Sequence, residues 1–168
     1  MITSIGDFVG KYELSTGMYD QAKLGDYIAK YEPLYLVNLF GASLYVEFNN
    51  DLILGGGTPT ENRFLYVFDP FNYDYNSEIL ISQGIREMLL GCIYFEYLKD
   101  LSNQVTVAGN VKPIGENSQN TSTLNTMMYG RYNDGIRSYR TIQYYMFGVK
   151  SEDYDGFNGR TKEFAYWL

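Results

Sequence analysis

Apolar side chains recur at every third or fourth position in two long stretches of the chain, and this spacing predicts two long helices. The first covers 78–101, where Ser77 is a suitable N-cap and Glu78 is favourable in the first turn. Its apolar positions nearly encircle the helix, which predicts that it lies in the middle of the fold. They are Ile81, Ile85, Met88, Leu89, Cys92, Ile93, Phe95 and Leu98.

The second long helix is expected from about Ser122 to Phe147. Gly130 and Gly135 weaken it locally, and Gly148 is a suitable residue to end it. Its apolar stripe repeats at a spacing of three to four residues almost without interruption. The stripe consists of Leu124, Met128, Tyr132, Ile136, Tyr139, Ile142 and Met146.

A broken pair of helices is predicted over 20–51, with Asp20 as the N-cap. Pro33 predicts an interruption, because proline clashes with the preceding helical turn and disfavours helical backbone at the residue before it. A second helix would then begin with Pro33 in its first turn, and Gly41 marks a break or kink.

Short β elements are expected between these helices. Residues 64–68 have the pattern of a short strand or a buried apolar segment, and 69–76 is rich in turn-forming residues. Residues 104–108 are typical of a strand. The polar stretch that follows predicts a loop, or a hairpin whose return strand lies around 111–114.

Together these elements predict a mainly α protein: a bundle of about four helices with a short β-hairpin or strands and extended terminal arms. We expect one domain over 1–168, since this length supports a single core of ordinary size. Residues 1–19 would form an extended N-terminal arm that could include a short strand, and 20–147 a helical core with a loop at 104–121. Residues 148–168 would form a C-terminal arm.

The composition narrows the possible functions. The 168 residues include no histidine and one cysteine, with 13 Lys+Arg against 20 Asp+Glu and a formal charge of −7. Without histidine the chain lacks the usual general base and the commonest metal ligand, which excludes Ser–His–Asp, Cys–His and zinc-hydrolase mechanisms within this chain. The composition therefore favours a non-enzymatic function.

Four local patterns have an ordinary explanation that we prefer to a catalytic, metal or cofactor site. The glycines of 55–57 are a linker, since no phosphate-binding motif surrounds them. Ser151, Asp153, Asp155 and Gly156 match the start of a calcium loop, but Lys162 stands where the final carboxylate is required. Glu87 and Glu96 are typical of charges on a helix surface, and Cys92 is typical of a buried, inert thiol. We therefore predict no catalytic, cofactor-binding or metal-binding residues.

The sequence also argues against membrane insertion and against strong DNA binding. No stretch approaches the ~20 consecutive apolar residues of a membrane-spanning helix, and 1–7 lacks the basic and apolar regions of a secretory signal. We expect a protein that is cytosolic where it is made and has no membrane partner. The excess of acid disfavours a role in gripping the phosphate backbone.

Several arginines and aromatic residues lie outside the apolar stripes and are candidates for contact with another protein. Residues 1–118 have a net charge of −8 and 119–168 of +1. Arginines beside exposed tyrosines are typical of interfaces, although a solvated helix face explains them as well. The aromatic residues of the C-terminal arm either pack on their own domain or bind a partner. The candidates are Arg131, Arg137, Arg140, Tyr129, Tyr144, Tyr145, Phe164, Tyr166 and Trp167.

The run 27–41, YIAKYEPLYLVNLFG, resembles the first helical segment of the head–tail connector, or adaptor, proteins of tailed bacteriophages. There a similar pattern of tyrosine–glutamate, tyrosine–leucine and leucine-x-glycine leads into a second helix with a phenylalanine near position 48. The later elements are also similar: a long helix such as 78–101 ending in Tyr-Phe-Glu-Tyr-Leu, a strand or hairpin loop such as 105–118, and a last long helix. The likeness covers roughly 20–147. Within this family, the chain most resembles the neck proteins of crAss-like phages of Bacteroidetes.

The resemblance implies a virion structural protein of the head–tail neck, made in the host cytoplasm. Its partners would be further copies in a ring of typically twelve, the portal protein, and tail or other neck ring proteins. Viral DNA would pass through the lumen without specific binding. The arms at 1–19 and 148–168 and the loop at 104–121 are our candidates for these contacts.

Two other classes of function remain as alternatives. The first is a soluble cytosolic accessory or regulatory protein that acts through a small-molecule pocket lined by tyrosines. The second is a hydrolase that uses only aspartate and glutamate, for which the sequence offers no carboxylate constellation. Recovery of the chain in purified virions would separate these alternatives from the ring protein.

Overall fold

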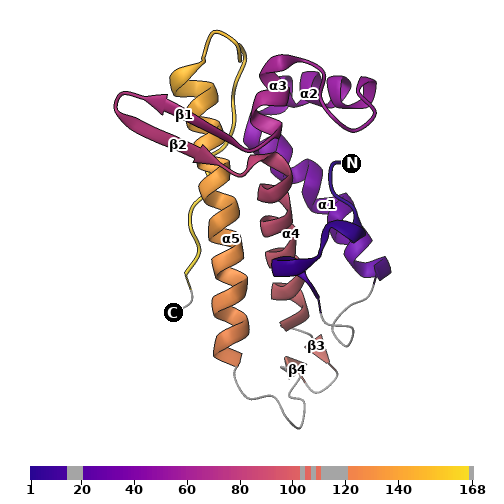
Figure 1. The fold of residues 1–168 in the computed structure, drawn as a ribbon. Helices are drawn as coiled ribbons and strands as arrows, with labels where there is room; N and C mark the ends of the chain where they lie inside the picture. Colours follow the sequence, from indigo (N-terminus) through magenta and orange to yellow (C-terminus); the bar gives the residue numbers. More distant parts are fainter. Residues whose placement is uncertain (15–20, 103–104, 107–108, 111–120, 167–168) are drawn as a thin grey trace.

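The computed structural model describes residues 1–14, 21–102, 105–106, 109–110 and 121–166. It is mainly helical with a small two-stranded antiparallel sheet (Figure 1), which confirms the predicted mainly α class with a short hairpin.

Two long antiparallel helices, α4 (Gly84–Ser102) and α5 (Thr121–Tyr144), form the centre of the molecule (Figure 1). The central position predicted for the first of them is confirmed, because its side chains from Met88 to Phe95 are buried. The two backbones approach closely where glycines face the neighbouring helix. A Cβ atom on Gly91 would lie 2.6 Å from the Arg131 carbonyl oxygen, and one on Gly135 would lie 3.0 Å from that of Met88. Gly135 therefore serves close packing between the two helices.

Helix α1 (Gln21–Phe40) runs through Pro33 without a break, so the predicted interruption there is wrong. Buried side chains continue on both sides of the proline, with Ile28 before it and Leu36 after it. Their burial against the core outweighs the loss of one helical hydrogen bond. The break falls at Gly41, as expected, where φ is +83° and α2 (Ala42–Leu54) begins.

The segment after α2 differs most from the prediction. Residues 64–68 belong to a short helix, α3 (Asn62–Phe68), although the buried character expected for them is confirmed at Phe64, Val67 and Phe68. The turn-rich stretch and the expected start of the long helix form a hairpin instead, with strands β1 (Phe71–Tyr75) and β2 (Glu78–Ser82).

Ser77 is consequently a turn residue and not a helix N-cap. Asn76 and Ser77 have φ values of +50° and +68°, the left-handed backbone that tight two-residue hairpin turns require. The sequence did not separate the strand from a helix because Ile79, Leu80 and Ile81 are all apolar, which hides the two-residue period.

Two short strands, β3 (Val105–Thr106) and β4 (Gly109–Asn110), pair beyond the end of α4. The strand expected over 104–108 is confirmed at 105–106. The return strand expected around 111–114 and most of the predicted loop lie outside the described residues.

The N-terminal segment does not project as an arm over its described part. It contains two short 3-10 turns, η1 (Ile5–Asp7) and η2 (Gly10–Tyr12), and no strand within 1–14. Ile2, Phe8 and Tyr12 are buried. The buried Glu32 carboxylate accepts hydrogen bonds from the backbone amides of Ile2 and Thr3 at 2.7 and 2.8 Å. These contacts hold the segment against the helices.

The C-terminal segment runs back along α5 (Figure 1). The chain first continues past α5 as a π-helical turn (η3, Tyr145–Val149), so the helix does not end at Gly148 as predicted. The amides of Asn158 and Arg160 donate to the carbonyls of Phe40 and Asn38, at 3.3 and 2.6 Å. The Tyr139 hydroxyl donates to the Arg160 carbonyl. This segment is therefore bonded to both α1 and α5 of the same chain.

Candidate interaction surface

The outer face of α5 carries three of the predicted interface residues. Arg137, Arg140 and Tyr144 are three and four residues apart and so share one side of the helix. Together with Thr141 they line one wall of an open groove of about 360 Å³, between the hairpin and the C-terminal segment. The remaining lining residues are Glu78, Leu80 and Phe164.

The two arginines of this groove already have acidic neighbours within the chain. Arg137 forms an ion pair with Asp134 at 3.0 Å. Arg140 lies 3.9 Å from Glu163 and 5.2 Å from the centre of the Phe164 ring. Such exposed pairs stabilise a fold by only ~0–1 kcal/mol. The groove is therefore close to charge balance, and exchange of these pairs for others would cost little.

Arg131 has a different environment, although the sequence grouped it with the other two arginines. Its side chain is half-buried, and Nε donates to the Lys11 carbonyl oxygen at 3.2 Å. Beside it, the Tyr12 hydroxyl donates to Glu87 at 3.0 Å, and Lys11 forms an ion pair with the same carboxylate. Arg131 thus fastens the N-terminal segment to α5.

The three predicted interface tyrosines of the last helix differ in their exposure to solvent. Tyr144 is exposed, whereas Tyr129 is half-buried with its ring 5.3 Å from that of Phe95. The expectation of a surface position is wrong for Tyr145, which is 6% exposed. Helix α3 and the hairpin enclose it, with the rings of Tyr66 and Phe71 at 4.9 and 5.2 Å. Burial raises the pKa of Tyr145 to about 12.

The C-terminal aromatic residues divide in a similar way. Phe164 is half-buried under Arg140, and the neighbouring Ala165 amide donates to the Asn133 side chain at 2.9 Å. Tyr166 is 72% exposed. Trp167 lies outside the described residues. The segment is therefore packed on its own domain at least as far as Ala165.

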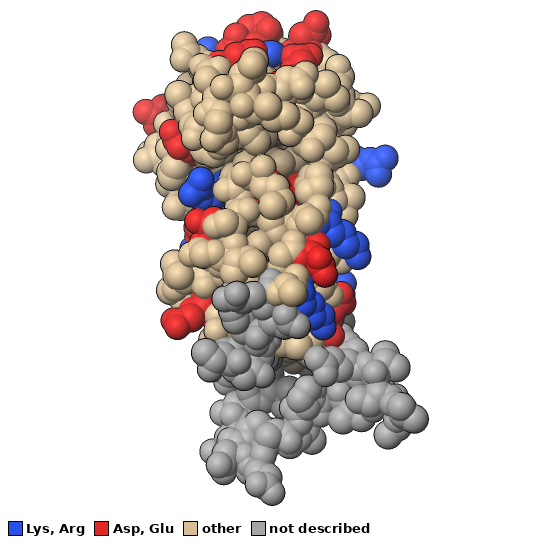
Figure 2. Space-filling view, turned by 90° about the vertical axis from the view of Figure 1, so that its right-hand side faces the viewer, with Lys and Arg blue, Asp and Glu red and all other residues tan. Residues whose placement is uncertain are grey.

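Acidic side chains gather at the end of the molecule that α2, α3 and the turn after η3 form (Figure 1, Figure 2), and the hairpin beside this end carries further carboxylates. Residues 42–83 and 145–158 hold nine acidic residues against two basic ones. This excess equals the formal charge of the whole chain, so the remaining residues are balanced. Sequence reasoning missed the acidic end because the two segments are far apart along the chain. The acidic residues are Glu47, Asp51, Glu61, Asp69, Asp74, Glu78, Glu152, Asp153 and Asp155.

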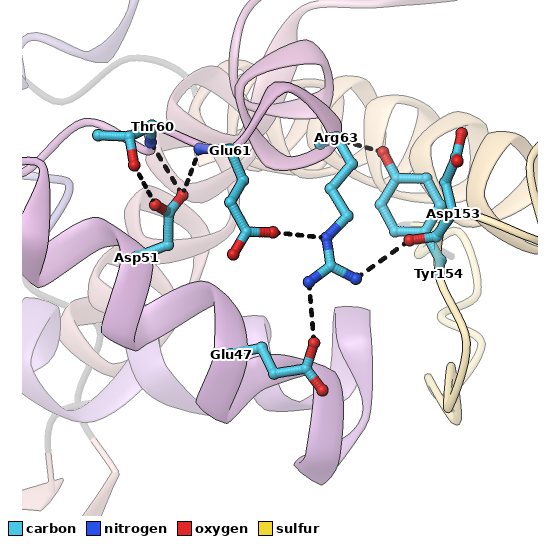
Figure 3. A network of polar contacts seen from close by, with 7 residues as sticks. All are labelled: Glu47, Asp51, Thr60, Glu61, Arg63, Asp153 and Tyr154. Atoms are coloured by element: carbon cyan, nitrogen blue, oxygen red, sulfur yellow. Dashed lines mark hydrogen bonds and ion pairs between the residues drawn. The ribbon is translucent and has the colours of Figure 1, made fainter.

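A polar network builds this end (Figure 3). The buried Asp51 carboxylate accepts hydrogen bonds from the amides of Thr60 and Glu61, at 2.9 and 3.0 Å. The Arg63 guanidinium binds Glu61, Glu47 and the Asp153 carbonyl, at distances from 2.8 to 3.1 Å. The network joins α2, α3 and the C-terminal segment.

The pKa of the Asp51 carboxyl reflects this network. Burial opposes its ionisation, but the hydrogen bonds from Thr60 and Glu61, together with the nearby Arg63, outweigh burial and lower the pKa.

Chemically reactive arrangements are not found among the described residues. No group of three or more Cys, Asp or Glu side chains there could hold a metal ion. The buried position predicted for Cys92 is confirmed, and burial raises the pKa of its thiol far above the usual range. Glu87 and Glu96 face different partners, since Glu96 accepts from the Tyr35 hydroxyl at 3.0 Å.

The tyrosines are used mainly in packing. Among the tyrosines that the structure describes, eight are buried in the core. The groove on α5 has Tyr144 in its lining, and a second groove, of about 380 Å³ beside the N-terminal segment, has Tyr12. Neither groove has the several tyrosines that the small-molecule alternative requires.

No helix in the described part of the chain is long and apolar enough to cross a membrane. Comparison with protein-family models, with curated proteins and with solved structures finds no match to this chain.

Proposed function

We propose that this chain is a virion structural protein, a subunit of the ring that joins the portal to the tail at the neck of a tailed bacteriophage. The run 27–41 and the order of elements resemble the connector proteins of such phages. In the structure this run is one continuous helix ended by Gly41, and it leads into a second helix. A central pair of long helices follows, as the proposed architecture requires.

The observation that carries the proposal is the arrangement of surfaces around the α4–α5 pair. The described chain presents open grooves and exposed apolar residues on several elements, while eight of its tyrosines are buried in the core. Subunits of a ring need such contact surfaces on different sides, because each copy meets two neighbours through different faces.

The acidic surplus agrees with a channel role. A protein grips DNA by replacing counterions with Lys and Arg, and this chain has more acidic than basic residues. Viral DNA could therefore pass a ring of these subunits without being held. We propose the portal, tail or other neck proteins and further copies of the chain as its partners in the virion.

The test is recovery and imaging of the chain in virions. Particles purified through a density gradient should contain the chain by mass spectrometry, and images of the neck should show a ring into which the described fold fits. Native mass spectrometry of the chain mixed with the portal protein should show a multimer of about twelve copies, the number that the resemblance implies. If purified particles lack the chain, or if only monomer forms with the portal present, the proposal is wrong.

A further inference from the structure

The hairpin presents an uncovered apolar face. The inner side of β1 and β2 packs on the molecule through Phe71 and Tyr73, whose rings contact Tyr145. On the outer side the paired positions are Asn72 with Ile81 and Asp74 with Ile79. Ile79 is 64% exposed and Ile81 54%. Two exposed isoleucines on one face of the hairpin form an apolar surface that another chain can cover.

A second exposed apolar strip lies on α1. Leu34 and Val37 are three residues apart on the helix and are 47% and 36% exposed. Lys30 lies one turn before Leu34 on the same side and is also exposed. Figure 2 shows this side of the molecule to be mostly uncharged through its middle. We call Lys30, Leu34 and Val37 the α1 strip.

The two surfaces carry opposite charges. The hairpin and its approach, 69–82, contain Asp69, Asp74 and Glu78 and no lysine or arginine. The basic residues that share a groove with Ile81, Lys11 and Arg137, are paired with Glu87 and Asp134, so the surface stays net acidic. Beside the α1 strip the C-terminal segment brings two further basic residues. The exposed Arg160 is bonded through its amide to the Asn38 carbonyl, and Lys162 lies 5.1 Å from the centre of the Tyr35 ring. Lys30, Arg160 and Lys162 stand against the exposed Asp26, one turn before Lys30, while Glu163 lies near Arg140 of α5.

The surfaces also belong to opposite sides of the central pair of helices. The hairpin lies against α5, whereas α1 packs mainly on α4 (Figure 1). One copy therefore cannot bring its own two surfaces together, but neighbouring copies can. A contact between two different faces repeats from copy to copy and gives a closed ring or a filament.

We propose that the outer face of the β1–β2 hairpin of one copy docks on the α1 strip of the next copy. Ile79 and Ile81 pack against Leu34 and Val37, and the hairpin carboxylates lie near Lys30. The inference deepens the proposed ring function and rests on it for the closure of the ring.

Cysteine cross-linking tests this contact on the full chain. Cys92 is the single native cysteine and is fully buried, so an introduced surface cysteine supplies the reactive thiol. Ile79→Cys and Leu34→Cys chains are mixed at millimolar concentration and oxidised mildly. We expect a disulfide-linked dimer on a non-reducing gel, with residues 79 and 34 joined in the peptide map. Ile53→Cys is the matched control, because Ile53 is 68% exposed at the end of α2 and belongs to neither surface.

A second measurement follows self-association by analytical ultracentrifugation. Ile79→Asp should weaken the association about tenfold or more, since it removes a large apolar side chain from the contact and adds a charge. Ile53→Asp should leave the association unchanged. Circular dichroism confirms that both variants fold, as expected for substitutions of exposed residues.

Several results would overturn the inference. They are a chain that stays monomeric at every concentration without cross-links, cross-linking of the Ile53→Cys control to the same extent, or cross-links that join 79 only to 79. Failure of the proposed function is distinguishable. If the chain cross-links as expected but is absent from virions, the proposed contact stands and the proposed function is wrong. If the chain is found in a neck ring but the 79–34 cross-link does not form, the proposed function stands and the proposed contact is wrong.

Discussion

Tyrosine hydroxyls connect distant parts of the chain through single hydrogen bonds. Tyr12 donates to Glu87 and Tyr35 to Glu96, each at 3.0 Å. The rings contribute to the core while each hydroxyl reaches a polar partner near its edge. Burial raises the pKa of both hydroxyls far above neutral pH, so they stay protonated and remain donors. Packing and these hydrogen bonds explain both tyrosines without a ligand.

Asp51 is the residue on which the acidic end most depends. Asp51→Asn should lower the free energy of unfolding by about 1–3 kcal/mol at pH 7, because an amide nitrogen would face the Thr60 or Glu61 amide donor. Urea denaturation measures this difference. The exposed Asp26→Asn is the control and should change stability by less than about 0.5 kcal/mol.

The effect of Asp51→Asn should also depend on pH. The folded pKa of Asp51 is lowered, so its carboxylate stabilises the fold above the ordinary aspartate pKa of about 3.9, and this contribution is lost as the pH falls through the folded value. The difference between the two proteins should therefore shrink below about pH 4. A difference that is constant from pH 7 to 3 would contradict the role assigned to the charge.

At the scale of elements, the crossing of α4 and α5 depends on a glycine. Gly91→Ala should destabilise the protein by about 1–3 kcal/mol, because its Cβ would lie 2.6 Å from the Arg131 carbonyl oxygen and force the helices apart. The melting temperature and the urea midpoint should both fall.

Gly130→Ala is the matched control on the facing helix. No atom outside its own helix lies within 4 Å of a Cβ at this position, so the substitution should gain about 1 kcal/mol from helix propensity alone. Equal effects of the two substitutions would show that close packing at Gly91 is unimportant.

The elements that the sequence predicted well are those with a long, regular pattern. Both long helices have many repeats of the apolar stripe, and the break at Gly41 has a local cause in its backbone conformation. Pro33 and the hairpin were predicted wrongly for the opposite reason. Pro33 is tolerated because of burial on either side of it, and the hairpin of 71–82 needs partners on α5 to be stable. Neither cause can be read from neighbouring residues.

For the whole molecule, the charge distribution predicts weak interaction with DNA. The surplus of acid lies in 42–83 and 145–158, and the rest of the chain has equal numbers of acidic and basic residues, so no part of the count leaves a net positive charge. At about 150 mM salt we expect the chain to bind duplex DNA more weakly than non-specific binders do, whose Kd values are typically ~10⁻⁴–10⁻⁶ M. Fluorescence anisotropy with a labelled duplex measures this, with a basic DNA-binding protein as positive control. Micromolar affinity that falls steeply with salt would contradict it.

The sequence by itself determined the mainly helical class, the central helix, the buried cysteine and the acid excess, since each depends on composition or on a pattern within one segment. It also named the arginines and tyrosines outside the stripes. Only the tertiary structure decided which of these reach the surface: Arg137, Arg140 and Tyr144 do, whereas Tyr145 is enclosed and Arg131 is engaged by the N-terminal segment. The acidic end likewise exists only because segments distant in sequence meet there. Exposure and local charge are properties of packing between such segments, and no single segment contains them.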